Sequence, residues 1–380
     1  MNEILTSKNI EKKFEEICQE FGVVGASACL FKNNELQYLS YGKREEDKNT
    51  DENTIYRIAS ISKIIVALAA MKLVEEKKLD LDEDISVYLG FKVRNIYHPD
   101  VKITTRMLMT QTSSITDGFD DEEMDNVEER RDTYNGVNGT FLPVSLEDLL
   151  IPNSSVYYND ITFDKQVPGT NFIYSNFGCG ILACLVERIS GEYFTDYVKK
   201  VLLTPLKLDA SFRIDEIQNF ENVSSTYIPQ NGKMVLNRTK ERFLRGVYPR
   251  FEVGQNYRGP AGGLFISAKD LSVIMQMLIN RGTYQGIKVY EPETIELMFV
   301  KNWEGNTDGY KAKGLQMAIM DVDGYKLYGH FGSAYGVRSF MFFDKDKKEG
   351  MCFICNGLMN HSYTDGNPNV HLRMFDILTK

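Results

Sequence analysis

The sequence RIASISKIIVALAAM, which occupies residues 57–71, decides the expected fold. From Ile61 onward it is apolar nearly all round, a pattern typical of a helix buried at the centre of a protein. Lys63 interrupts the first turn, and burial of a lysine is costly because loss of water disfavours the ammonium form. The stretch therefore predicts a central helix with an exceptional polar residue near its start.

Ser60 and Lys63 lie close enough in this stretch to act together. Their spacing places them on one helix face with Cβ atoms about 5–6 Å apart. A desolvated lysine can take the proton of a serine hydroxyl, and a helix N-terminus can stabilise an oxyanion. The alternative is that Ser60 caps the helix and Lys63 reaches water, although a capping box needs Glu or Gln at position 63. The same S-x-x-K spacing at Ser40 and Lys43 falls on a strand.

Both ends of the chain show the alternation and turn residues typical of antiparallel strands. Residues 23–31 and 36–41 flank Lys32-Asn33-Asn34-Glu35, which predicts a hairpin. Near the other end, short polar turns separate further strands and imply antiparallel neighbours. These strands are expected at 315–320, 326–328, 337–343 and 351–356, with terminal helices before Gly22 and at 370–379.

Between the two ends, the periodic segments are mostly helical. They cover residues 61–77, 104–110, 146–150, 180–189, 193–201 and 268–279. We therefore expect an α/β (α+β) fold, in which an antiparallel β-sheet flanked by helices lies beside an all-helical region. Residues 1–80 and 255–380 are predicted to form the sheet domain, and residues 81–254 the mainly helical region.

The composition excludes several classes of function. The 380 residues are 43% hydrophobic and 26% charged, as in globular proteins, and the net charge is −9. No Lys/Arg run exceeds two residues, so a nucleic-acid partner, which needs a clustered basic face, is not expected. No apolar run is long enough for a membrane span and no signal peptide is visible. This predicts a cytoplasmic protein, or a secreted one if a leader was removed.

The cysteines and histidines indicate neither a metal site nor a cofactor. Six cysteines in a chain of this size are typical of buried thiols. Cys352 and Cys355 form a C-x-x-C, but in a strand-like run their side chains would face opposite ways. The four histidines lack zinc-ligand spacing, which argues against a metalloenzyme.

A Tyr-Ser-Asn triplet at residues 174–176 precedes an apolar helical segment. Tyr174 could move protons beside a cationic lysine, and the amide of Asn176 could orient that lysine and a substrate carbonyl. The alternative is that Tyr174 only packs and Asn176 caps the next helix. A similar Tyr-Tyr-Asn triplet at 157–159 lies in a polar loop.

The run YGHFGSAYG, at residues 328–336, begins a predicted strand and has glycines where a ligand backbone could approach closely. A strand edge beside a nucleophile could pair with an extended acyl substrate and donate a backbone N–H to its carbonyl. The candidate residues for this binding are His330, Gly332 and Ser333. A histidine between glycines is, by itself, also typical of a turn.

In this order, the three motifs resemble those of the serine β-lactamase and penicillin-binding-protein superfamily, especially its class C β-lactamase, D-alanyl carboxypeptidase and esterase branch. Further matching segments extend nearly from end to end of the chain. They are YRIAS at 56–60, LVEEKKLDLD at 73–82, PGTNFIYSN at 168–176, Pro205-Leu206 and GGLFISAKDL at 262–271. The resemblance implies a β-lactamase/transpeptidase-like fold with the site between the sheet and the helices.

The resemblance also implies a role for each catalytic candidate. Ser60 matches the acylated nucleophile and Lys63 its basic partner. Tyr174 matches the general base that activates Ser60 and later the deacylating water, while Asn176 matches the residue that binds the substrate amide.

His330 to Gly332 match the third motif, and the backbone N–H groups of Ser333 and Ser60 match an oxyanion hole. Class C β-lactamases usually carry lysine where this chain has His330, so the argument for binding a β-lactam carboxylate is weaker. Residues 108–115 also depart from the family's usual Leu-x-His-x-Ser-Gly-Leu, a difference that we interpret as structural.

The expected function is a serine hydrolase that acts through an acyl-enzyme on an ester or amide, of the carboxylesterase or D-amino-acid peptidase/amidase type. A β-lactamase is the alternative within the same class. A non-hydrolysing protein that binds penicillin or an acyl ligand is the alternative of another class. The expected partner is a small-molecule or short-peptide acyl substrate, and the oligomeric state stays open.

The segment 117–132 contains nine acidic residues and two basic ones. A solvated loop or helix face is the simpler interpretation. The alternative hypothesis is a negatively charged rim that favours cationic substrates.

Overall fold

The computed structural model describes residues 7–118, 132–307 and 309–380. Within these residues the main sheet has nine strands, in the order β10-β11-β12-β13-β14-β15-β1-β2-β3, and neighbouring strands are antiparallel. Both ends of the chain supply its strands. They are β1 (Gly25–Lys32), β2 (Glu35–Glu45), β3 (Lys48–Asn49), β10 (Trp303–Thr307), β11 (Tyr310–Lys313), β12 (Ala318–Val322), β13 (Tyr325–Ala334), β14 (Val337–Asp344) and β15 (Glu349–Cys355).

The predicted antiparallel sheet is confirmed, including the hairpin near the start of the chain. Asn33 and Asn34 join β1 to β2 with φ angles of 53° and 62°, a conformation that asparagine tolerates in tight hairpin turns. The pairing of β1 with β15 joins the two ends of the chain into one sheet. Strands β10 and β11 were not predicted. The sequence of β10 is largely polar and lacks strand alternation, and β11 alternates over only four residues.

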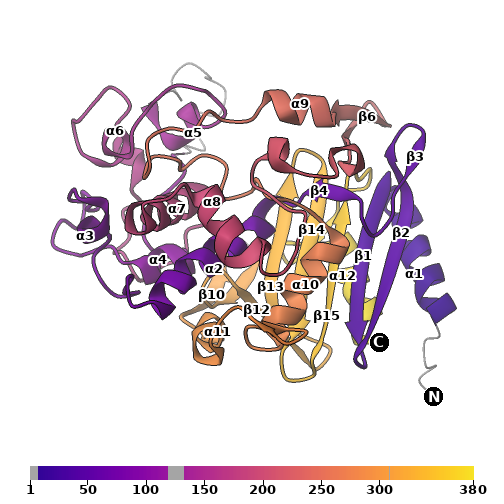
Figure 1. The fold of residues 1–380 in the computed structure, drawn as a ribbon. Helices are drawn as coiled ribbons and strands as arrows, with labels where there is room; N and C mark the ends of the chain where they lie inside the picture. Colours follow the sequence, from indigo (N-terminus) through magenta and orange to yellow (C-terminus); the bar gives the residue numbers. More distant parts are fainter. Residues whose placement is uncertain (1–6, 119–131, 308) are drawn as a thin grey trace.

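Helices cover both faces of the sheet (Figure 1). Helix α10 (Ala268–Ile279) packs against β14, β15 and β1 on one face. Helices α1 (Ser7–Glu20) and α12 (Asn369–Thr379) pack together on the other face. Cys352 belongs to the core under α10 and Cys355 to the core under α1 and α12, so their side chains face opposite ways as predicted.

Helix α2 (Ser62–Glu75) is the centre of the molecule. Its residues from Ile64 to Leu68 are fully buried, as the nearly all-round apolar sequence predicts. The helix packs against α7 (Asn176–Ser190) and α11 (Pro292–Phe299). Smaller helices gather beside α7, away from β1 and β2 (Figure 1). They include α3 (Ile85–Leu89), α4 (Thr105–Thr110), α5 (Tyr134–Val137), α6 (Leu146–Leu150) and α8 (Phe194–Val198).

Short elements connect the sheet to these helices. Strand β4 (Ile55–Arg57) pairs with β7 (Phe265–Ser267) directly before the central helix. A separate hairpin of β5 (Thr226–Gln230) and β6 (Lys233–Arg238) is followed by α9 (Lys240–Arg245). The two remaining small hairpins pair β8 (Thr283–Tyr284) with β9 (Ile287–Lys288) and β16 (Tyr363–Thr364) with β17 (Asn367–Pro368). None of the described helices is both long and apolar enough to cross a membrane.

Candidate active site

Ser60 lies in a sharp turn between β4 and α2. Ala59 has a φ of 52°, a left-handed conformation that is uncommon for a residue with a side chain. A single 3₁₀ turn, Ala59–Ile61, then leads directly into the helix. The first helical turn of α2 has no side-chain cap, and Ser60 is partly exposed. The serine therefore does not act as the helix cap.

Strand β13 approaches the backbone just before Ser60 very closely. A Cβ atom at Gly332 would lie 2.4 Å from the carbonyl oxygen of Ile58 and 2.2 Å from Ser339 Oγ. Ser339 Oγ in turn donates a hydrogen bond of 2.9 Å to the same Ile58 oxygen. Gly332 is thus required for the contact between the strand and the turn that carries Ser60.

The ammonium group of Lys63 is buried at the centre of the candidate site. Its Nζ lies 3.1 Å from Ser60 Oγ, and donates to Asn176 Oδ1 at 2.8 Å and to the carbonyl oxygen of Ala261 at 2.9 Å. The side chain is 0% exposed, so it does not reach water. Burial lowers the pKa of Lys63 to about 8, while the carboxylate of Asp117 acts to raise it.

Tyr174 contacts both Lys63 and Ser60. The Lys63 Nζ lies 4.7 Å from the centre of its ring. A side-chain hydrogen bond with Ser60 lowers the pKa of Tyr174, but burial has the larger effect and raises that pKa above its usual value. The phenol therefore stays protonated at neutral pH.

Asn176 begins helix α7 but does not cap it. The cap is Ser175, whose Oγ accepts a hydrogen bond of 2.8 Å from the N–H of Gly178. This leaves the Asn176 amide free to bridge two charged groups. Its oxygen accepts from Lys63, and its Nδ2 donates to Asp117 Oδ2 at 2.7 Å.

Asp117 is a buried part of this site, which sequence analysis missed. It is 7% exposed, and its Oδ1 accepts hydrogen bonds from the N–H of Phe177 at 2.8 Å and from Ser175 Oγ at 3.2 Å. The expectation of a solvated acidic face is therefore wrong at Asp117. Residues 119–131 of that segment, and with them the rim proposed for cationic substrates, lie outside the described residues.

Replacement of Asp117 by alanine should destabilise the fold. The substitution leaves the Phe177 N–H, the Asn176 amide and the Ser175 hydroxyl without their acceptor. Loss of hydrogen bonds to a buried charged group predicts a decrease of about 2–3 kcal/mol in the free energy of unfolding, measurable by urea denaturation. Asp132→Ala is the control, because among the described residues that carboxylate accepts a single hydrogen bond, of 3.1 Å, from Asn159. Equal losses in both variants would contradict the assigned role of Asp117.

The third predicted motif is only partly at the site. His330 is 0% exposed, its Nδ1 donates to the carbonyl oxygen of Phe331 at 2.6 Å, and its ring centre lies 6.3 Å from that of Tyr174. Burial, Lys313 and Lys63 lower its pKa well below the usual value, so the ring is neutral. Ser333 is exposed, and no hydrogen bond joins its side chain to the cluster in the described part of the chain.

Lys313 is a second buried lysine that sequence analysis did not single out. Its side chain is 0% exposed, and its Nζ lies 4.8 Å from the centre of the Tyr310 ring, with no hydrogen-bond partner among the described residues. Burial and the charge of Lys63 lower its pKa to about 7. Strand alternation would place Lys313 on the same side of the strand as Lys311, which is exposed. The sequence pattern therefore did not predict that Lys313 is buried.

The Beta-lactamase family model matches residues 10–374. The chain belongs to the Beta-lactamase family. Among solved structures, it is similar to the octameric penicillin-binding protein homologue from Pyrococcus abyssi, with a TM-score of 0.72 and 25% identity over 97% of this chain and 76% of that one.

Two curated proteins illustrate the sequence similarity. Protein flp of Staphylococcus aureus is 27% identical over 207 residues, which cover 53% of this chain and 37% of that protein. N-acetylmuramyl-L-alanine amidase of Bacillus subtilis is 23% identical over 310 residues, or 73% of this chain and 63% of that protein. The matched part of this chain thus spans less than two thirds of each relative. The β-lactamase/transpeptidase-like fold expected from the motifs is confirmed.

Proposed function

We propose that this protein is a serine hydrolase that cleaves an ester or amide through an acyl-enzyme on Ser60. The observation that carries the proposal is the contact of 3.1 Å between Ser60 Oγ and the buried Nζ of Lys63. A hydroxyl becomes a nucleophile when an adjacent group accepts its proton, and a lysine whose pKa is about 8 is partly neutral near physiological pH. Ser60 is also partly exposed, so an acyl carbon can reach it.

In the proposed reaction, Ser60 Oγ attacks the acyl carbon and its proton moves to Lys63. The resemblance assigned the role of base to Tyr174. The raised pKa of this tyrosine favours a different assignment of the catalytic roles. Lys63 accepts the proton, and the Tyr174 hydroxyl relays it to the leaving group. Water then attacks the acyl-enzyme by the same path. Asn176 holds Lys63 in place from one side and Asp117 holds Asn176 from the other.

An ester or amide is a better candidate substrate than a β-lactam. His330 occupies the position of a cationic lysine in class C enzymes, and the lowered pKa of this buried ring keeps it uncharged. It therefore offers no permanent charge to a β-lactam carboxylate. The similarity to the N-acetylmuramyl-L-alanine amidase of Bacillus subtilis supports an amide-cleaving activity. The roles of Gly332 and of the Ser333 backbone N–H at an oxyanion hole stay predictions.

A labelling and turnover experiment separates hydrolysis from ligand binding. A fluorophosphonate probe should label Ser60, and p-nitrophenyl esters, D-aminoacyl amides and nitrocefin should then be compared as substrates. Turnover of an ester or amide supports the proposal. Labelling by penicillin without turnover of any compound in the panel would instead identify a non-hydrolysing binder.

The pH dependence tests whether Lys63 is the base. The pKa of Lys63 is lowered to about 8, and the reaction needs the neutral amine. We expect kcat/KM to rise with pH, about tenfold per unit below this pKa, and to level off above it. A profile that is flat between about pH 6 and 9 would exclude Lys63 as the proton acceptor.

A further inference from the structure

A cavity of about 220 Å³ lies next to the candidate active site. A single water needs only about 10–15 Å³ of such space, so the cavity can hold an organic group. Its wall combines aromatic rings with five arginines, which is unusual in a chain whose net charge is −9. The arginines are Arg57, Arg213, Arg238, Arg250 and Arg258.

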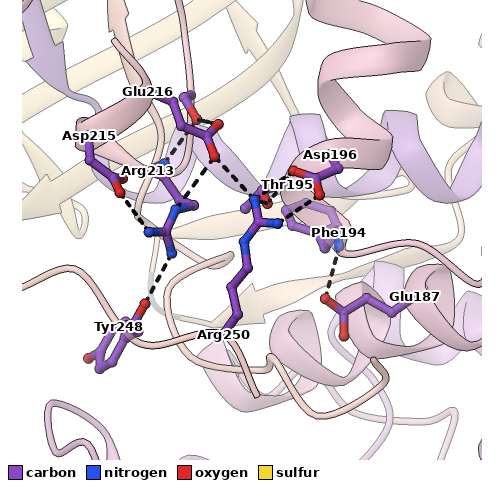
Figure 2. Close-up of polar contacts among 10 residues, drawn as sticks. Glu187, Phe194, Thr195, Asp196, Arg213, Asp215, Glu216, Tyr248 and Arg250 are labelled. Carbon is purple, nitrogen blue, oxygen red and sulfur yellow. Dashed lines mark hydrogen bonds and ion pairs between the residues drawn. The ribbon is translucent and has the colours of Figure 1, made fainter. Parts of the chain in front are cut away.

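Two of these arginines are neutralised by carboxylates (Figure 2). Arg213 pairs with Asp215 at 2.6 Å, and Arg250 pairs with Asp196 at 2.7 Å. Both arginines also reach Glu216. These two arginines therefore belong to an ion-pair network that has no need of an added anion, and Arg213 Nη1 also donates to the carbonyl oxygen of Tyr248 at 3.1 Å.

Two other arginines of the wall, Arg57 and Arg238, carry unbalanced positive charge. The guanidinium carbons of Arg57 and Arg238 lie 4.7 Å and 4.0 Å from the centre of the same ring, that of Tyr335. Arg57 donates through Nε to the carbonyl oxygen of Gly262, and neither arginine has an ion pair with a carboxylate among the described residues. Burial and the neighbouring charges of Arg57 and Arg242 lower the pKa of Arg238.

Arg258 adds a third guanidinium without a counter-ion in the described part of the chain. It is 6% exposed and donates only to neutral groups, which include the carbonyl oxygens of Thr140 and Leu142. Its Nε is buried and has no hydrogen-bond partner there. Tyr248 also lines this cavity. Burial raises the pKa of its phenol, while Arg57 and Arg258 act to lower it.

The same segments form the wall of the cavity and the candidate active site. Gly259, Pro260 and Gly263 line the cavity, while Ala261 between them accepts a hydrogen bond from Lys63. Arg57 lies just before the turn that carries Ser60, and Tyr335 follows directly on the strand β13 that packs against this turn.

We infer that Arg57 and Arg238 in the wall of this cavity bind a carboxylate on the acyl group of the substrate. The inference rests on the proposed acyl-enzyme function and specifies the substrate class. A planar guanidinium forms paired hydrogen bonds with a carboxylate, which makes arginine well suited to recognise this group. The aromatic rings of Tyr248 and Tyr335 would contact the apolar part of the acyl chain.

Paired esters of equal carbon number test this inference. Mono-p-nitrophenyl esters of succinate, glutarate and adipate should be compared with p-nitrophenyl butanoate, pentanoate and hexanoate. We expect the ratio of kcat/KM for the charged ester to that for the neutral ester to be largest at one chain length. Arg238→Gln should lower this ratio roughly 10- to 100-fold, and Arg57→Gln should lower it in the same direction.

Arg245→Gln is the matched control, because Arg245 is an exposed arginine on α9 outside the cavity. It should leave the ratio unchanged, and circular dichroism should show that all variants are folded. A ratio unaffected by both Arg238→Gln and Arg57→Gln, or a preference for neutral esters at every length, overturns the inference. If the neutral esters are still cleaved in that case, only the inference of a carboxylate site is contradicted. If neither these esters nor the D-aminoacyl amides are cleaved, the proposed function itself fails.

Discussion

Replacement of Ser60 by alanine should lower kcat by on the order of 10⁴-fold or more and abolish labelling by a fluorophosphonate. The variant retains Lys63 and Tyr174 but has no oxygen on which an acyl group can form. The free energy of unfolding should change little, because Ser60 is partly exposed and does not cap α2.

Ser40→Ala is the control for this experiment. Ser40 belongs to the other S-x-x-K sequence of the chain, but it is exposed on β2, and its Lys43 contacts the carbonyl oxygen of Glu46 instead. This variant should hydrolyse ester substrates at the rate of the unmodified protein. Retention of full activity in Ser60→Ala would show that the nucleophile is another residue.

Tyr174→Phe should have the second largest effect, a decrease in kcat on the order of 10³-fold. The substitution keeps the ring that lies over Lys63 but removes the hydroxyl that contacts Ser60. The proton then has no relay between the amine and the leaving group. Because the ring remains in place, a stopped-flow measurement of acylation should show the loss without a change in circular dichroism.

Tyr158→Phe tests whether Tyr174, and not Tyr158, relays the proton. The phenol of Tyr158 is perturbed by burial and by Asp160, and no residue of the Ser60 cluster contributes to its pKa. Its hydroxyl interacts with Asp160 and with no residue of the Ser60 cluster, so its removal should leave the rate of hydrolysis nearly unchanged. Similar losses of activity in Tyr158→Phe and Tyr174→Phe would mean that the effect is structural.

The local sequence was sufficient to predict most of the helices and strands that position the site. The all-round apolar run after Ser60 predicted α2, and the residues from Ile64 to Leu68 are indeed fully buried. The asparagine pair at the first hairpin predicted the turn between β1 and β2. These elements depend on side-chain periodicity and backbone preference, which neighbouring residues determine. Strand β10 lacks such periodicity, and β11 alternates over only four residues; both pair with neighbouring strands of the sheet.

The sequence by itself determined that a serine and a lysine begin the central helix, and that a tyrosine and an asparagine precede another. Only the tertiary structure decided what surrounds them. It buried Asp117 behind Asn176, placed Lys313 near His330 and left Arg57 and Arg238 without a carboxylate partner in the described residues. Burial and charge pairing depend on segments that lie far apart in the chain, so no local pattern of residues carries them.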